Sequence, residues 1–106
     1  RAKNAYCFHI ANAWEEGRSI RIVGCPQEFF SFQYASSSKS RFYEWTLDLE
    51  DGSVAERELD GTHVEFPVIH PALTGRRNRF VWAARFTGGS PPFGSICGCV
   101  RYDLQT

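Results

Sequence analysis

The stretch YEWTLDLEDG, residues 43–52, decides the class of fold. Its apolar residues stand at every second position from Tyr43 to Leu49, with polar residues between them. A two-residue period is typical of a β-strand that buries one face. The stretch ends in residues that favour a tight turn at Gly52. Residues 53–59 are therefore predicted to return as the partner strand of a hairpin.

The same alternation occurs on both sides of this hairpin, at residues 6–10, 20–23, 80–86 and 96–104. Segments rich in Gly, Pro and Ser separate the runs, at residues 35–40, 71–75 and 88–94. Because no stretch keeps a helical period for three turns, the sequence predicts an all-β fold. A sandwich, a barrel and a propeller all fit this pattern. Propeller blades have four strands, so the chain is long enough for roughly two blades or parts of three, but no internal repeat selects this architecture.

Length and composition predict one globular domain at most. The 106 residues are 42% apolar and 23% charged, which is too apolar for intrinsic disorder. Twelve basic and twelve acidic residues cancel, so no net charge favours nucleic acid or an anionic membrane. No apolar run approaches the roughly 20 residues that span a bilayer. Because the chain opens at Arg1 and contains no Met, we expect residues 1–106 to be a fragment of a single longer domain.

Four cysteines are candidates for metal ligands: Cys7, Cys25, Cys97 and Cys99. The last two form a C-x-C pair, whereas structural zinc sites usually use a C-x-x-C knuckle at each end. Reduced, partly buried thiols are therefore the expectation, with zinc as the alternative.

Three histidines, His9, His63 and His70, are candidates for metal ligands, because imidazole is the commonest neutral ligand in proteins. His9 lies between the bulky apolar residues Phe8 and Ile10. A buried imidazole there needs a partner at both ring nitrogens, and coordination at one with a hydrogen bond at the other would supply them. His70 precedes a proline, where a solvated or capping role is expected.

Glu65 is the other unusual residue, because it stands in the otherwise apolar run at residues 64–69. A carboxylate there must find a hydrogen-bond donor. Two interpretations stay open: a charge on the exposed face of an edge strand, or a carboxylate that accepts the N–H of a metal-bound histidine. His63 lies two residues earlier, on the same face of a strand, and a surface pair between the two is expected.

Four segments carry motifs that occur in a fixed order: FHIANAWEE at 8–16, EFPVIHP at 65–71, GRRNRFVWAA at 75–84 and VRYDL at 100–104. Together they resemble the motifs of the carotenoid cleavage oxygenase family. That family includes carotenoid and epoxycarotenoid cleavage dioxygenases, stilbene-cleaving relatives and a retinoid isomerase. Each motif alone is weak, but the ordered set covers most of residues 5–104.

The resemblance implies a seven-bladed β-propeller with Fe(II) on its axis, held by four histidines that three glutamates orient. Residue by residue, His9 matches an iron ligand, Glu65 matches an orienting glutamate, and Phe8 matches an aromatic residue of the substrate tunnel. If so, the Glu65 carboxylate should lie within hydrogen-bond reach of the His9 ring, about 2.7–3.2 Å. His70 stands where the family commonly has Asn, and is expected to lie outside the metal site.

The implied function is oxidative cleavage of a conjugated C=C bond of a carotenoid or apocarotenoid by O2. Because the chain lacks the other three ligand motifs, we expect it to be a slice of about two blades that is inactive and binds iron weakly alone. The resemblance further implies a plastid or cytoplasmic location and a peripheral membrane contact of the full-length enzyme, and no nucleic-acid partner. The alternatives are a non-catalytic β-rich interaction module, a stilbene-cleaving oxygenase and a retinoid isomerase. An interaction module would need neither His9 nor Glu65.

Overall fold

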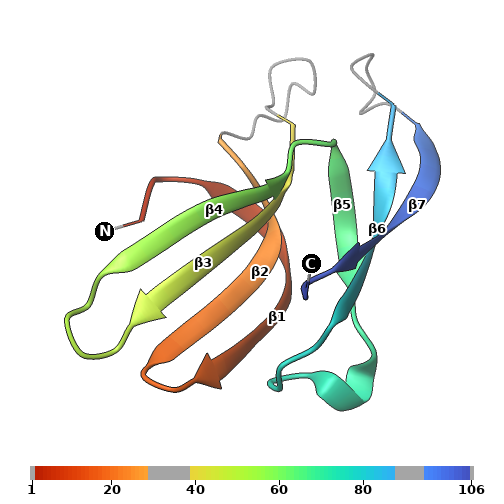
Figure 1. Ribbon diagram of the computed structural model, residues 1–106. Coiled ribbons are helices and arrows are strands. Elements are labelled where there is room, and N and C mark those ends of the chain that lie inside the picture. Colours follow the sequence, from red (N-terminus) through yellow and green to blue (C-terminus); the bar gives the residue numbers. More distant parts are fainter. Residues whose placement is uncertain (1, 29–38, 88–94, 106) are drawn as a thin grey trace.

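The computed structural model describes residues 2–28, 39–87 and 95–105, and these are almost entirely β-structure (Figure 1). The strands, in chain order, are β1 (Tyr6–Glu16), β2 (Ser19–Gln27), β3 (Phe42–Asp48), β4 (Val54–Asp60), β5 (Val64–Val68), β6 (Phe80–Phe86) and β7 (Ile96–Asp103). One short 3-10 helix, η2 (Pro71–Leu73), follows β5. The all-β prediction is confirmed for the described residues, in which no helix is long and apolar enough to cross a membrane.

The strands form two antiparallel sheets that lie side by side (Figure 1). The first has the order β1-β2-β3-β4 and the second the order β5-β6-β7, so each strand pairs with its neighbour in the sequence. The predicted hairpin is β3–β4, and its turn contains Gly52 at a φ of 74°, a conformation that glycine adopts without steric cost. β5 contacts β1 and β2, which joins the two sheets. The loop predicted at residues 88–94 lies outside the described residues.

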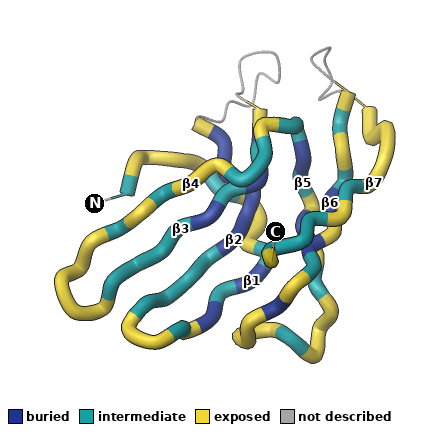
Figure 2. Tube along the Cα trace, in the orientation of Figure 1, coloured by how far each residue is buried: buried dark blue, intermediate teal, exposed yellow. Residues whose placement is uncertain are grey.

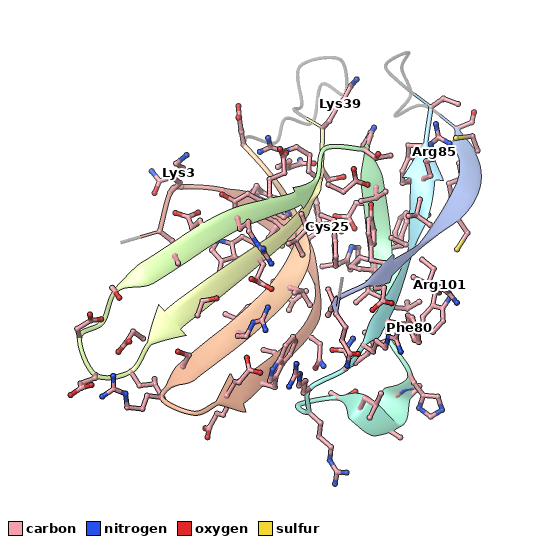
Figure 3. The ribbon with its side chains drawn as sticks, viewed as in Figure 1. Lys3, Cys25, Lys39, Phe80, Arg85 and Arg101 are labelled. Atoms are coloured by element: carbon pink, nitrogen blue, oxygen red, sulfur yellow. The ribbon has the colours of Figure 1, made fainter. Side chains whose placement is uncertain are left out.

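The core lies where the two sheets face each other. Figure 2 shows buried segments along the facing strands, whereas the hairpin turns of the first sheet are exposed. The buried apolar residues come from both sheets: Trp14, Val23, Cys25, Phe42, Val64, Val81 and Ala83. Cys25 on β2 lies in the interior between the sheets (Figure 3). The Tyr102 ring of β7 stacks on Phe42 at a centroid distance of 4.1 Å and extends this core.

One prediction about β3 is wrong. The alternation assigned its apolar face to the core, but Glu44 is only 7% exposed while Tyr43 and Trp45 are partly exposed. A buried carboxylate needs a cation, and Glu44 has two: its carboxylate forms an ion pair with Arg21, and the Arg57 guanidinium lies 3.4 Å away. The paired charges let the polar face of β3 turn inward.

Asn12 of β1 connects the first sheet to the loop that follows β5. Its Nδ2 group donates to the carbonyl oxygens of Leu73 and Arg76, at 3.2 and 2.8 Å, and to Asn78 Oδ1 at 2.8 Å. Its Oδ1 atom accepts from the N–H of Gly75 at 2.9 Å. Asn12 is buried, so both ends of its amide are used where water is largely excluded.

We predict that Asn12→Asp lowers the free energy of unfolding of the whole protein by about 2–4 kcal/mol. The carboxylate keeps the acceptor for Gly75 but replaces the amide donor, and it faces two carbonyl oxygens and Asn78 Oδ1. Denaturant titration measures the change. The control is Asn4→Asp at an exposed position, where the same replacement should change stability by less than about 0.5 kcal/mol. Equal effects at the two positions would contradict the role given to Asn12.

Tyr102 and Asp60 form a second connection between the sheets, because the Tyr102 hydroxyl donates to Asp60 Oδ2 at 2.7 Å. Burial alone would raise the pKa of Asp60, but hydrogen bonds from Tyr102 and Thr62 outweigh it and leave the pKa below its ordinary value. A carboxyl with a depressed pKa in the folded state stabilises the fold at neutral pH. That contribution is lost as the pH falls through the folded-state pKa.

We therefore predict that Tyr102→Phe costs about 1–2 kcal/mol of stability at pH 7. The difference from the wild type should start to shrink as the pH falls below about 4, the ordinary pKa of Asp, and should vanish below the lower pKa that Asp60 has in the folded state. Denaturant unfolding of both proteins at neutral and at acid pH tests this. A difference that does not change with pH would show that the ring, and not the hydrogen bond, carries the effect.

Candidate metal centre

His9 lies in the irregular first half of β1, where the pairing with β2 shifts register between Cys7 and Ile10 and again between Ile10 and Asn12. Gly24 on β2 makes this irregularity possible. A Cβ atom at Gly24 would lie 3.0 Å from the His9 carbonyl oxygen and 3.0 Å from Ile10 Cδ1, which is too close for comfortable packing. The glycine thus lets the backbone of His9 approach β2, and the irregular register sets the direction of the imidazole.

The structure brings His9 and Glu65 together. The distance between His9 Nδ1 and Glu65 Oε2 is 2.9 Å, so the predicted hydrogen bond between these residues, 56 positions apart, is confirmed. An ionised carboxylate can only accept a hydrogen bond, so toward it Nδ1 acts as the donor, and in the neutral imidazole with this tautomer Nε2 has the free lone pair. The imidazole was expected to be buried, but its side chain is 47% exposed in the described chain. The exposed part of the imidazole is therefore accessible to another bound group, such as a metal ion.

Glu65 is the more buried partner, because its side chain is 13% exposed. The interpretation of Glu65 as an exposed charge on an edge strand is therefore wrong, although β5 is an edge strand of its sheet. Glu65 Oε2 also accepts from the N–H of Phe66 at 2.5 Å. Glu65 Oε1 is buried and has no hydrogen-bond partner among the described residues. Among the described residues, the carboxylate is therefore held in place by the two hydrogen bonds to its Oε2 atom.

Aromatic rings flank the imidazole of His9. The Phe8 ring lies 6.4 Å from it and the Phe66 ring 5.3 Å from it, both measured between centroids. Phe66 is also 6.1 Å from Phe86 of the second sheet. Phe8 was predicted here from its motif, whereas sequence reasoning missed Phe66. In the described part of the chain, the histidine therefore lies among apolar rings with its Nε2 outside the hydrogen bond to Glu65.

The other two histidines do not belong to this cluster. His70 caps η2, because its Nδ1 atom accepts from the N–H of Ala72 at 3.1 Å, which confirms the capping role. His63 stacks on Phe86 at 5.1 Å, and burial lowers the pKa of its imidazole. The expected surface pair between His63 and Glu65 is not formed among the described residues, since the carboxylate binds His9 instead.

The cysteines near the pair are free thiols, with Cys25 buried and Cys7 partly buried. Burial raises the pKa of both thiols, and the negative charge of Glu65 acts in the same direction. A thiol must lose its proton to bind a metal, so these two are poor ligands at neutral pH. Within the described ranges no group of three or more His, Cys, Asp or Glu residues could hold a metal ion. His9 is thus a candidate for one ligand of a site that other residues would complete.

The fold and this cluster define an all-β protein in which a carboxylate of one sheet holds an imidazole of another. Comparison with known sequences gives the family. The family described as "RPE65: Retinal pigment epithelial membrane protein" matches residues 1–106. The chain therefore belongs to this family, the carotenoid cleavage oxygenases.

Curated relatives agree with this assignment. The chain is 25% identical to carotenoid 9,10(9',10')-cleavage dioxygenase 1 of Pisum sativum over 96% of its own length and 20% of that protein. It is 27% identical to apocarotenoid-15,15'-oxygenase of Synechocystis over 95% of its length and 22% of the relative. It is 29% identical to 9-cis-epoxycarotenoid dioxygenase NCED1, chloroplastic, of Oryza sativa, over 92% of its own length and 15% of that relative. The chain thus spans about a fifth of the length of the curated relatives that it matches.

A solved structure shows the same fold. The crystal structure of cobalt-substituted Synechocystis ACO superposes with a TM-score of 0.84 at 23% identity, over 98% of this chain and 24% of that one. At this level of identity the similarity establishes the fold alone. It extends over both sheets, so their arrangement is that of the matching part of the larger protein.

We predict that Gly24→Ala lowers the free energy of unfolding by about 1–3 kcal/mol, because the new methyl group meets the backbone of β1 at His9. The matched control is Gly98→Ala on β7, where an added Cβ meets nothing within 4 Å and stability should change by less than about 0.5 kcal/mol. Denaturant unfolding compares the two. A crystal structure of the Gly24 variant should show a longer distance between His9 Nδ1 and Glu65 Oε2, and an unchanged distance would count against Gly24 as the residue that positions the histidine.

Proposed function

We propose that this chain is part of a non-haem Fe(II)-dependent dioxygenase that cleaves a conjugated C=C bond of a carotenoid or apocarotenoid. In this proposal the two sheets are about two blades of a seven-bladed propeller. His9 is one iron ligand, Glu65 orients it, and Phe8 lines the substrate tunnel. The observation that carries the proposal is the hydrogen bond between His9 Nδ1 and Glu65 Oε2, made between the two sheets.

The donor chemistry fits a divalent transition metal. Histidines that bind metals usually donate their other ring N–H to a carboxylate or a carbonyl, which fixes the tautomer and makes the free nitrogen more basic. Glu65 does this for His9, and imidazole is a suitable ligand for iron. The Synechocystis structure is described as cobalt-substituted, so that protein accepts a transition metal. Bound iron would supply oxygen activation, the step that protein side chains do not provide.

The residues of this chain have separate tasks in the proposed reaction. Glu65 holds a proton at Nδ1 of His9, so that Nε2 stays available to the metal. Phe8 and Phe66 place apolar rings beside the imidazole, and these offer contact area to a hydrocarbon. A polyene has no ionisable group for acid–base attack, so these residues act by binding and orientation.

The relatives support the substrate class. Their names specify carotenoids, zeaxanthin, an apocarotenoid and a 9-cis-epoxycarotenoid, all of which are conjugated polyenes. The aromatic rings beside His9 suit such a molecule better than a polar substrate. Two relatives are named as chloroplastic and one as chromoplastic, which is compatible with the proposed plastid or cytoplasmic location.

An interaction module without catalytic function is the second candidate. Such a module would need only exposed edges and surfaces, and it would derive no benefit from a buried carboxylate fixed on a half-exposed imidazole.

Stilbene cleavage and retinoid isomerisation would use the same metal ligands. Assays of the whole enzyme with carotenoid, apocarotenoid, stilbene and retinyl ester substrates distinguish the three activities.

For the whole enzyme we predict that His9→Ala removes iron and activity, because the metal loses a ligand. Glu65→Gln should reduce iron affinity or rate by roughly 10- to 100-fold, the usual effect of losing the partner of a metal-bound histidine. Iron content by elemental analysis and product formation by chromatography measure both effects. The control is His70→Asn, which removes an imidazole outside the cluster and should keep iron and activity. Normal iron and rate in both His9→Ala and Glu65→Gln would refute the proposal.

A further inference from the structure

Phe66 has an unusual backbone conformation for its residue type. Its φ angle is +54°, and it is the only residue other than glycine with a positive φ in the described chain. The glycines with positive φ lie at 17, 52 and 75, each outside the strands, whereas Phe66 lies inside β5. A bulky side chain in this region costs free energy, because its Cβ approaches the backbone. Such strain persists where the surroundings enforce it, and it is often found at functional sites.

The conformation of Phe66 changes where its N–H points. In the pairing of β5 with β6, Glu65 is opposite Ala84 and Val68 is opposite Trp82, with a register shift between them. At this irregularity the N–H of Phe66 leaves the strand ladder and donates to Glu65 Oε2 at 2.5 Å. The same oxygen accepts from His9 Nδ1 at 2.9 Å. Two donors therefore converge on one carboxylate oxygen, and the second comes from the residue at which the backbone turns.

We propose that the left-handed backbone at Phe66 is the device that fixes the Glu65 carboxylate on His9, which makes Phe66 a positioning residue for the metal ligand. It acts through its N–H, and its ring has a separate role. The inference rests on the function proposed above, and it adds a residue that the resemblance to the family did not assign.

Burial and contacts separate the backbone from the ring. Phe66 is 53% exposed, and its ring contacts His9 and Phe86 from the open side. An aromatic ring that only lines a tunnel needs no strained backbone, because a regular strand would also present it on one face. In a regular strand, however, the N–H of Phe66 would not point at the side chain of the preceding residue. The strain is therefore explained by the hydrogen bond to Glu65.

Substitutions at Phe66 can separate the two roles, because residues differ in how well they accept positive φ. Phe66→Asn loses the ring but tolerates the left-handed region. Phe66→Ala loses the same ring and resists that region, and the β-branched Phe66→Ile resists it more strongly. Co(II) titration of the metal-free whole enzyme, in competition with a chelator, reports the metal site without depending on turnover. Thermal unfolding confirms that each variant is folded.

We expect Phe66→Ile to weaken Co(II) binding about tenfold, close to the effect of Glu65→Gln, because both variants release the carboxylate from its position. Phe66→Ala should weaken binding severalfold, whereas Phe66→Asn should stay within about twofold of the wild type. The double variant Glu65→Gln/Phe66→Ile should bind no more weakly than Glu65→Gln, since the two residues act through one hydrogen-bonded group. If Phe66→Ile does not fold, the comparison of Ala with Asn decides the question.

Equal loss of affinity in the Asn and Ala variants would overturn the inference, because the ring would then be responsible. Wild-type affinity in both the Ile and Ala variants would also overturn it. In either case the proposed function stands, provided that His9→Ala and Glu65→Gln still weaken Co(II) binding. Unchanged Co(II) binding in His9→Ala would instead refute the proposed function, and the role of Phe66 with it.

Discussion

The structure depends most on the contact that Asn12 makes with the loop after β5. This amide is buried and uses its donors and its acceptor on four groups between Leu73 and Asn78. The loop links β5 to β6, so fixing it against β1 also fixes the second sheet against the first. His9 lies three residues before Asn12 on the same strand, and Glu65 lies at the start of β5. The polar contact of Asn12, supported by the apolar core around Val23 and Val64, therefore keeps the strands that carry the imidazole and the carboxylate beside each other.

Much of the fold follows from the sequence, because strands with one buried face leave a two-residue period. The hairpin at β3 and β4 and the strands β6 and β7 lie where alternation predicted them. Which face of each strand is buried was harder to predict. Glu44 is buried because Arg21 and Arg57 neutralise it, and these partners come from strands whose register is not visible in the sequence. The irregular pairing around His9 was not predictable either, because it depends on the approach of two backbones at Gly24.

The candidate site was predictable only in part. His9 and Glu65 are separated by 55 residues, and no spacing rule connects them, so their pairing came from the resemblance of two motifs. Phe66 stands in one of those motifs, but its residue type does not predict a positive φ, which is usually found at glycine or asparagine. Its conformation results from the tertiary arrangement of β5, β6 and the carboxylate. At Phe66 the hydrogen bond to Glu65 therefore outweighs the preference of a bulky residue for a negative φ.

The order of strands in the two sheets has a consequence for how the protein matures. Each sheet is built from consecutive strands, so most of its pairings are local and can form while the chain is being synthesised. The bond between His9 and Glu65 is different, because β1 must wait for about fifty more residues before β5 arrives. Until the second sheet docks, nothing selects which nitrogen of the imidazole carries the proton. Under the proposed function, the two sheets would therefore have to assemble before His9 could bind a metal, and a nascent or misassembled chain would lack the hydrogen bond that orients this histidine.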